Sequence, residues 1–160
     1  IKAMQIFKYL EKPIDAETIQ SILHDISPTG GTALIVDDDP SAIDILRHFI
    51  IDGKFTIDTA STGNEGLQKI TSMKPNCVVL LDIMLPDIDG FTIVNRILEN
   101  KKEHPLIILT SCRDLTKEEY TFITKNNIFY LPKSQFSRND IVRVIKKAKA
   151  RYGGKNESQT

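Results

Sequence analysis

The sequence contains four short apolar runs, and a polar residue follows each of them within two positions. Runs of four or five residues rich in valine, isoleucine and leucine are typical of strands buried on both faces of a parallel sheet. The segments between the runs have the apolar spacing of amphipathic helices. The pattern therefore predicts an α/β fold in which helices cover both faces of a parallel sheet. The runs are 33–36, 77–81, 106–109 and 128–131.

The polar residues after these runs are candidates for a shared site. Asp37 and Asp38 follow the first run, Asp82 the second, Thr110 the third and Lys133 the fourth. Ligands of parallel α/β sheets bind outside the carboxyl ends of the strands, where these side chains would meet. Three carboxylates, a hydroxyl and an ammonium at one edge are typical of a site that handles phosphoryl groups with Mg²⁺.

Four motifs contain these residues: 34–40 (LIVDDDP), 80–90 (LLDIMLPDIDG), 108–111 (ILTS) and 130–133 (YLPK). In this order and spacing they resemble the signature blocks of the receiver domain of two-component response regulators. The resemblance covers roughly residues 32–152. It implies a flavodoxin-like, doubly wound sheet of five parallel strands in the order 2-1-3-4-5.

Helix-capping patterns predict where the helices begin. The patterns are Asp39 before Pro40, Thr62 with Glu65, Thr116 with Glu119, and Ser137 with Asp140. Together with the apolar spacing they predict helices over 40–52, 63–73, 90–101, 116–125 and 138–151. The strands are predicted over 32–37, 55–60, 77–82, 106–110 and 128–131.

The first 26 residues resemble the end of a second receiver. Residues 9–12 (YLEK) match 130–133 (YLPK) at a distance of about one domain, and 15–26 have helical apolar spacing. A repeat at this spacing indicates tandem receivers. The alternative is an unrelated linker helix. We therefore expect four parts: the strand-helix end of a preceding receiver or a linker helix over 1–26, a linker over 27–31, the receiver over 32–152 and a disordered tail over 153–160.

Composition excludes some classes of partner. Lysine plus arginine and aspartate plus glutamate both number 21, so the net charge is zero. Such a chain has no general attraction to nucleic acids or anionic membranes, and no apolar stretch is long enough to span a membrane. Two cysteines, Cys77 and Cys112, do not make a disulfide framework. We expect a cytoplasmic domain without direct nucleic-acid or membrane contact.

The resemblance implies a role for each residue of the site. Asp82 is expected to accept a phosphoryl group on its carboxylate as an acyl phosphate. Asp37, Asp38 and Asp82, with the backbone carbonyl of Met84, are expected to bind Mg²⁺ through oxygen atoms. This arrangement makes the chain the acceptor for a histidine kinase or a histidine phosphotransfer protein.

Three further residues are implied in phosphate binding and switching. The Lys133 ammonium and the Thr110 hydroxyl would bind phosphoryl oxygens. Movement of Thr110 toward the phosphate would leave space into which Tyr130 rotates, and this would change the surface formed by the last strand and the last two helices. A homodimer would use this surface or residues 1–26.

Met84 and Cys112 are expected to set the lifetime of the phosphorylated state. They stand two positions after Asp82 and Thr110, where side chains influence hydrolysis in this family. Neither a thioether nor a thiol orients a water molecule through a strong hydrogen bond. We therefore expect slow loss of the phosphoryl group.

Two other functions fit parts of the pattern. A phosphatase of the haloacid dehalogenase type would need a second aspartate two residues after the nucleophile, where Met84 stands. A degenerate receiver that serves as a docking scaffold is favoured by Ser134, where the family usually has a proline after a cis peptide bond. The complete aspartate set opposes this alternative. We expect a signalling module rather than an enzyme.

Overall fold

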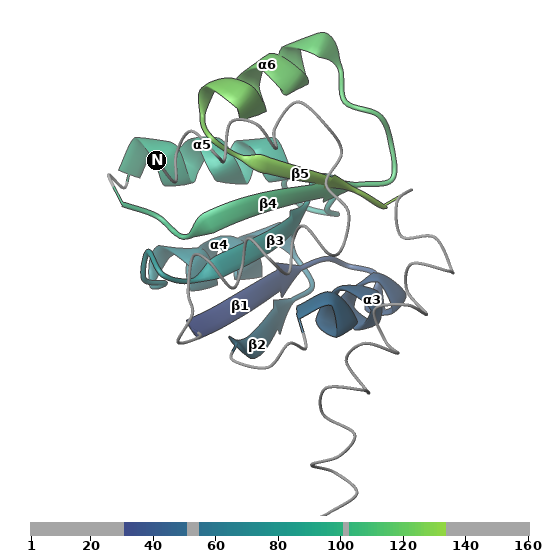
Figure 1. The fold of residues 1–160 in the computed structure, drawn as a ribbon, viewed down its shortest axis with the longest axis vertical. Helices are drawn as coiled ribbons and strands as arrows, with labels where there is room; N and C mark the ends of the chain where they lie inside the picture. Colours follow the sequence, from purple (N-terminus) through teal and green to yellow (C-terminus); the bar gives the residue numbers. More distant parts are fainter. Residues whose placement is uncertain (1–30, 51–54, 101–102, 134–160) are drawn as a thin grey trace, which may run out of the picture.

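The computed structural model describes residues 31–50, 55–100 and 103–133. Within these ranges the chain alternates between strands and helices (Figure 1). The elements are β1 (Gly31–Val36), α3 (Pro40–Ile50), β2 (Phe55–Ala60), α4 (Gly63–Thr71), β3 (Val78–Asp82), α5 (Gly90–Asn100), β4 (Leu106–Ser111), α6 (Lys117–Lys125) and β5 (Phe129–Pro132).

All five strands of the described sheet are parallel, and their order is β2-β1-β3-β4-β5. This order confirms the doubly wound arrangement predicted from the sequence. The central strand is β3, whose five residues are all buried. Its register places Asp82, the last residue of β3, beside Thr110 on β4. The carboxyl end of β3 is therefore the centre of the edge at which ligands of such sheets bind.

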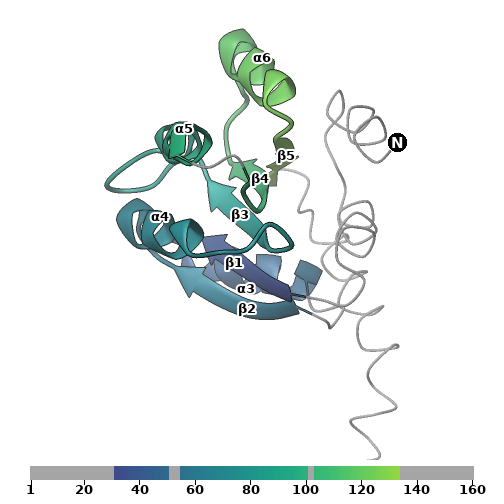
Figure 2. The ribbon, with the colours of Figure 1, turned by 90° about the vertical axis from the view of Figure 1, so that its left-hand side faces the viewer.

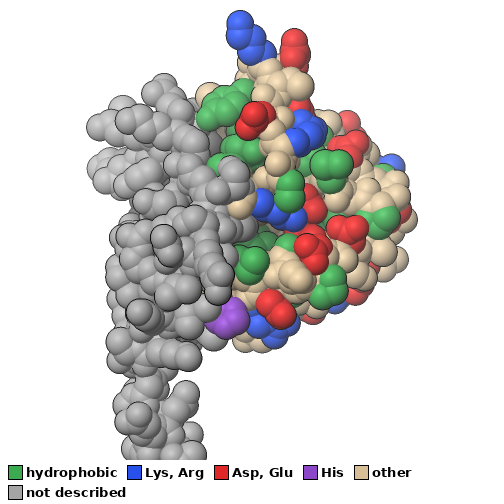
Figure 3. All heavy atoms as spheres, turned by 90° about the vertical axis from the view of Figure 1, so that its right-hand side faces the viewer, with side chains coloured by type: hydrophobic (Ala, Val, Ile, Leu, Met, Phe, Trp, Pro, Cys, Tyr) green, Lys and Arg blue, Asp and Glu red, His purple; other side chains and the backbone are tan. Residues whose placement is uncertain are grey.

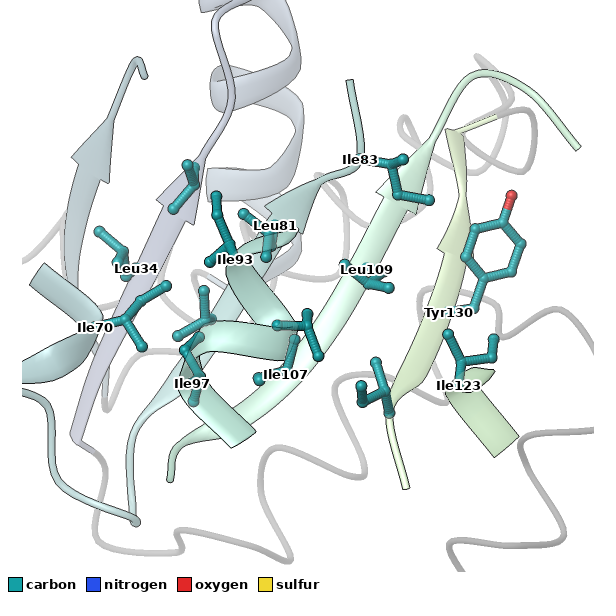
Figure 4. Packing of buried hydrophobic residues seen from close by; sticks show 14 of the residues in the cluster. Leu34, Ile70, Leu81, Ile83, Ile93, Ile97, Ile107, Leu109, Ile123 and Tyr130 are labelled. Atoms are coloured by element: carbon teal, nitrogen blue, oxygen red, sulfur yellow. The ribbon is translucent and has the colours of Figure 1, made fainter. Parts of the chain in front are cut away.

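Strands β1, β3 and β4 are mainly apolar because both of their faces are buried, whereas the edge strand β2 alternates between partly buried and exposed residues. On one face, Ala33 and Ile35 of β1 pack with Leu46 and Ile50 of α3. On the other face, strand residues pack against α4, α5 and α6, as Figure 4 shows in close-up. Viewed along the strands, α4 and α5 lie on the face opposite α3 (Figure 2). The labelled residues of Figure 4 are Leu34, Ile70, Leu81, Ile83, Ile93, Ile97, Ile107, Leu109, Ile123 and Tyr130.

Local hydrogen bonds explain where the helices begin and end. Glu65 N–H donates to the Thr62 side chain at the start of α4, and Thr116 and Glu119 form a complete capping box at the start of α6. These two caps are confirmed. Helix α4 ends at Thr71, two residues earlier than predicted, because Ser72 N–H donates to the Lys69 carbonyl in a tighter turn.

The strand boundaries differ from the predicted ones by one residue at several ends. Strand β1 begins at Gly31, which pairs with Phe55, and it ends at Val36. Strands β4 and β5 each extend one residue further, since Ser111 pairs with Pro132. Differences of this size are usual where strands fray.

Several predictions lie outside the described residues. These are the strand-helix segment over 1–26, most of the linker, the last helix over 138–151, the tail over 153–160 and the backbone at Ser134. No cis peptide bond occurs within the described ranges. Those ranges also contain no helix long and apolar enough to cross a membrane.

Candidate functional site

Three carboxylates come together at the carboxyl edge of the sheet. Asp37 and Asp38 follow β1, and Asp82 ends β3. One carboxylate oxygen from each of the three lies within 4.8 Å of the others. Asp37 and Asp82 are buried, whereas Asp38 is exposed. Figure 3 views the molecule from the side to which the strand arrows of Figure 1 point, and acidic and basic side chains lie close together there.

Lys133 lies between two of these carboxylates. Its Nζ is 2.7 Å from Asp37 Oδ2 and 3.2 Å from Asp82 Oδ2. The contact with Asp82 is also a hydrogen bond, but the contact with Asp37 is an ion pair by distance alone. Asp37 Oδ2 is a buried oxygen for which the described residues provide this ion pair with Lys133 and no further hydrogen bond. Such an atom is suited to a cation.

Asp82 and Lys133 each shift the pKa of the other. Burial raises the pKa of the Asp82 carboxyl, and the negative charge of Asp37 adds to this rise, while Lys133 and the Met84 N–H oppose it. Burial alone would lower the pKa of the Lys133 ammonium, but the Asp37 and Asp82 carboxylates raise it above its usual value. Lys133 is therefore charged at neutral pH. The buried acids would gain further stabilisation from a second positive charge.

Thr110 brings a hydroxyl to the same edge. It pairs with Asp82 in the sheet and is completely buried. Its Oγ1 has no hydrogen-bond partner among the described residues. A buried hydroxyl without a partner costs free energy in the absence of a ligand. The position of this hydroxyl suits an incoming oxygen atom that accepts a hydrogen bond.

Met84 and Cys112 lie in the two loops that leave the central strands. Met84 N–H donates to Asp82 Oδ1 at 3.1 Å, and the Met84 side chain is 58% exposed. Cys112 is an exposed free thiol in the loop after β4. Met84 thus lies two residues after Asp82 and Cys112 two residues after Thr110, and both residues are exposed to solvent.

Tyr130 packs into the core beside α6, and its hydroxyl reaches the loop after β4. The hydroxyl donates to the Arg113 carbonyl at 3.0 Å. Burial raises the pKa of this tyrosine. The ring stands at the edge of the hydrophobic cluster in Figure 4. Tyr130 therefore connects β5 to the loop that follows Thr110.

Two side-chain interactions near the site were not predicted. The Asp87 carboxylate accepts hydrogen bonds from two N–H groups at the start of α4. The Arg113 guanidinium forms two hydrogen bonds with the Glu119 carboxylate. Asp87 is separated from its partners by more than twenty residues, so no local pattern reveals the contact. The Thr116–Glu119 capping box was predicted from the sequence, but the additional ion pair of Glu119 with Arg113 was not.

The cluster of Asp37, Asp38 and Asp82 suits Mg²⁺ because of the atoms that it offers as ligands. All the offered atoms are oxygens, which hard divalent cations prefer. One of these oxygens, on Asp37, is buried and pairs with Lys133 without a further hydrogen bond from the described residues. Mg²⁺ usually binds through a few protein oxygens and several waters, so a cluster with one exposed carboxylate provides an entry path.

A family model described as the response regulator receiver domain matches residues 33–146. Over 109 residues the chain is 32% identical to the transcriptional regulatory protein TrcR of Mycobacterium tuberculosis, which covers 68% of this chain and 41% of TrcR. Over 78 residues it is 35% identical to the alkaline phosphatase synthesis transcriptional regulatory protein PhoP of Bacillus subtilis, covering 49% of this chain and 32% of PhoP. The chain thus spans about two fifths or less of these relatives.

Solved structures share the fold. The response regulator protein TrrA of Thermotoga maritima in complex with Mg²⁺-BeF has a TM-score of 0.54 and 28% identity, covering 74% of this chain and 98% of TrrA. A structure of the histidine kinase ThkA in complex with TrrA gives the same score and identity, covering 74% of this chain and 97% of the matched chain.

Proposed function

Because the chain belongs to the family of response regulator receiver domains, we propose that it is a phosphoacceptor module of two-component signal transduction and that Asp82 receives the phosphoryl group. The observation that supports Asp82 most strongly is its position. It ends the central strand, its carboxylate lies within 4.8 Å of those of Asp37 and Asp38, and it accepts a hydrogen bond from Lys133.

The proposed chemistry is the transfer of a phosphoryl group to a carboxylate. An Asp82 carboxylate oxygen attacks phosphorus, a new P–O bond forms, and the bond to the donor breaks with its electron pair leaving on the donor. Asp82 must be ionised to attack, and Lys133 favours that form against the effect of burial. The product is an acyl phosphate with additional negative charge.

Asp37, Asp38 and Asp82 are the residues that would hold Mg²⁺, together with the backbone carbonyl of Met84. When bound, this ion supplies positive charge to the phosphoryl oxygens and offsets the repulsion between acids and phosphate. The similar response regulator TrrA was solved in complex with Mg²⁺-BeF, which supports the choice of ion. Lys133 would move from its carboxylate partners toward a phosphoryl oxygen as a point charge.

Through Thr110 and Tyr130, the negative charge that phosphorylation adds at Asp82 would change the surface formed by β5 and α6. The Thr110 hydroxyl, which has no partner among the described residues, would donate to a phosphoryl oxygen. The Tyr130 hydroxyl donates to the Arg113 carbonyl, in the loop that begins two residues after Thr110. Rearrangement of this loop would therefore change the packing of β5 and α6.

The proposed partner is a histidine kinase or a histidine phosphotransfer protein. A complex of ThkA with the similar receiver TrrA supports this choice. The relatives named as transcriptional regulators are longer than this chain, and the zero net charge gives no reason to propose direct nucleic-acid binding here. The module is proposed to signal rather than catalyse, in a reducing, cytoplasmic setting that suits the free thiols of Cys77 and Cys112.

Intact-mass spectrometry with acetyl phosphate tests this function. We expect one phosphate adduct when Mg²⁺ is present and none in its absence, because the acid cluster repels the donor without the cation. Asp82→Asn should lose the adduct. Asp39→Asn is the matched control, since Asp39 caps α3 beside the cluster and Asn also caps helices, so this variant should be labelled like the wild type. Equal labelling of Asp82→Asn would show that another residue is the acceptor.

A further inference from the structure

The loop that follows Asp82 is attached to the start of α4 by one carboxylate. Gly63 N–H donates to Asp87 Oδ1 at 2.7 Å, and Asn64 N–H donates to Asp87 Oδ2 at 2.8 Å. Both oxygens of Asp87 are thus engaged by consecutive backbone amides. These are two of the N–H groups that a helix leaves without partners at its first turn.

The remaining donors of this turn are satisfied within α4 itself. Glu65 N–H donates to the Thr62 hydroxyl, and Gly66 N–H donates to the Thr62 carbonyl. Helix α4 therefore already has an ordinary N-cap in Thr62. The Asp87 contact adds a second function to the helix start, because it joins two segments that are distant in sequence.

The close approach of the two segments depends on Gly63. A Cβ at this position would lie 2.6 Å from Ile88 Cγ1, 2.9 Å from the Ile88 carbonyl oxygen and 3.0 Å from Asp87 Oδ1. A side chain there would push away the loop that contains Asp87. The hydrogen bonds and the missing side chain are independent features, and both keep this loop against α4.

The tethered loop also contains one proposed metal ligand, the backbone carbonyl of Met84, and it directly follows another, Asp82. It begins directly after Asp82 and includes Met84, whose N–H donates to Asp82 Oδ1. One end is held at the sheet, since Ile83 N–H donates to the Thr110 carbonyl, and the other end is held to the first, since Gly90 N–H donates to the Ile83 carbonyl. Asp87 holds the segment between these ends.

We propose that Asp87 is a positioning residue for the cation site, because its attachment to α4 fixes the backbone that orients Asp82 and the carbonyl of Met84. The inference rests on the proposed function, in which Mg²⁺ binds this cluster. Side chains that orient metal ligands without touching the metal commonly change its affinity by 10- to 100-fold. Hydrogen bonds from Asn64 and Gly63 also lower the pKa of the Asp87 carboxyl, so it is ionised at neutral pH.

Calorimetric titration of the full chain with Mg²⁺ alone tests the proposal. We expect Asp87→Ala to weaken binding on the order of tenfold. Asp87→Asn, which keeps one acceptor oxygen, should lose less affinity. Thr62→Ala is the matched control because it removes a hydrogen bond from the same helix start without touching the loop. It should bind Mg²⁺ like the wild type.

Gly63→Ala provides a second test if Asp87→Ala fails to fold. It leaves the carboxylate in place and improves the helix propensity of α4, yet it should weaken Mg²⁺ binding by displacing the loop. The proposal is overturned if the Asp87 variants and Gly63→Ala bind Mg²⁺ like the wild type, or if Thr62→Ala loses as much affinity as Asp87→Ala. Loss of binding in Asp37→Asn alongside unchanged Asp87 variants would overturn this inference and leave the proposed function standing. A wild type that does not bind Mg²⁺ would overturn both.

Discussion

Two loops border the carboxylate cluster, and they are held in different ways. The loop over 83–89, between β3 and α5, is attached through the Asp87 carboxylate, which accepts from the Gly63 and Asn64 backbone amides, and through Gly90 N–H, which donates to the Ile83 carbonyl. The loop over 112–116, between β4 and α6, is attached through the exposed Arg113–Glu119 ion pair and through the Tyr130 and Ser111 hydroxyls, which bond to the Arg113 backbone.

This difference separates a fixed part of the site from a part that can be released. Two charge-assisted hydrogen bonds from backbone amides to the Asp87 carboxylate, together with close backbone contacts around glycine, leave little freedom to rearrange. The Arg113 side chain, in contrast, is 42% exposed, and exposed ion pairs contribute about 0 to 1 kcal/mol. Of the proposed metal ligands, the Met84 carbonyl is therefore on the fixed loop, which begins directly after Asp82, and the loop nearest Tyr130 can change at low free-energy cost.

Gly90→Ala should disrupt the loop over 83–89 and cause the largest loss of stability among these variants. A Cβ at Gly90 would lie 2.8 Å from the Asp82 carbonyl oxygen and 2.9 Å from Ile83 Cα. These are backbone atoms at the end of the central strand, and they cannot move without disturbing the sheet. We expect a loss of about 3 kcal/mol in the free energy of unfolding, measured with urea.

Gly66→Ala is the control for this prediction. Its Cβ would meet the Val36 side chain rather than backbone, and an alanine within α4 regains about 1 kcal/mol of helix propensity. It should therefore destabilise the protein less than Gly90→Ala. An equal or larger loss in Gly66→Ala would show that the loop backbone is not especially constrained.

The lifetime of the phosphorylated state should depend on one residue from each loop. Met84 and Cys112 are both exposed and neither orients water strongly. Combining Met84→Asn with Cys112→Glu should speed phosphate loss by roughly tenfold, which requires only about 1.4 kcal/mol. Release of inorganic phosphate after labelling measures this rate, and the two single variants show which loop contributes more. A double variant that is no faster would exclude water access as the limiting factor.

Glu119→Gln should weaken the attachment of the second loop in a pH-dependent way. The Arg113 guanidinium, with burial opposing it, lowers the pKa of Glu119 from 4.5 to about 2. A group with a lowered pKa in the folded state stabilises it above the unfolded pKa, and this contribution is lost as pH falls through the folded value. The advantage of the wild type over Glu119→Gln should therefore be full above pH 4.5 and disappear toward pH 2.

The expected advantage is about 1 kcal/mol, because Arg113 is largely exposed. Glutamine can still complete the capping box with Thr116, so the variant isolates the charge. Glu118→Gln, on the exposed side of the same turn, is the control and should match the wild type. Urea unfolding at several pH values measures both variants. A Glu119 effect that does not vary between pH 4.5 and 2 would contradict the assigned ion pair.

The sequence predicts elements whose signal is local. Strand β3 is recognisable because every one of its residues is buried and apolar until Asp82. Thr116 and Glu119 lie three residues apart, so their capping box is visible without a fold. The order of the strands came from the family motifs, since no spacing rule in the chain fixes it, whereas the grouping of Asp37 with Asp82 at one edge followed from their positions at the ends of parallel strands.

The contacts that sequence did not predict join segments through space. Asp87 has the same local pattern as an ordinary loop aspartate, and its partners are known only once α4 lies beside the loop. Arg113 could have paired with several nearby acids, and the turn after Ser111 selects Glu119. Helix α4 ended early because the chain tightened at Ser72, which propensity alone does not reveal.

Amide hydrogen exchange, read residue by residue by NMR with Mg²⁺ present, compares the two loops directly. Gly63 and Asn64 amides report the Asp87 attachment, whereas Arg113 and Thr116 amides, which donate to Ser111 and Glu119, report the second loop. On addition of acetyl phosphate, exchange should change at Arg113 and Thr116 and stay constant at Gly63 and Asn64. A change at Gly63 and Asn64 that equals or exceeds the change at Arg113 and Thr116 would contradict the division into a fixed and a releasable loop.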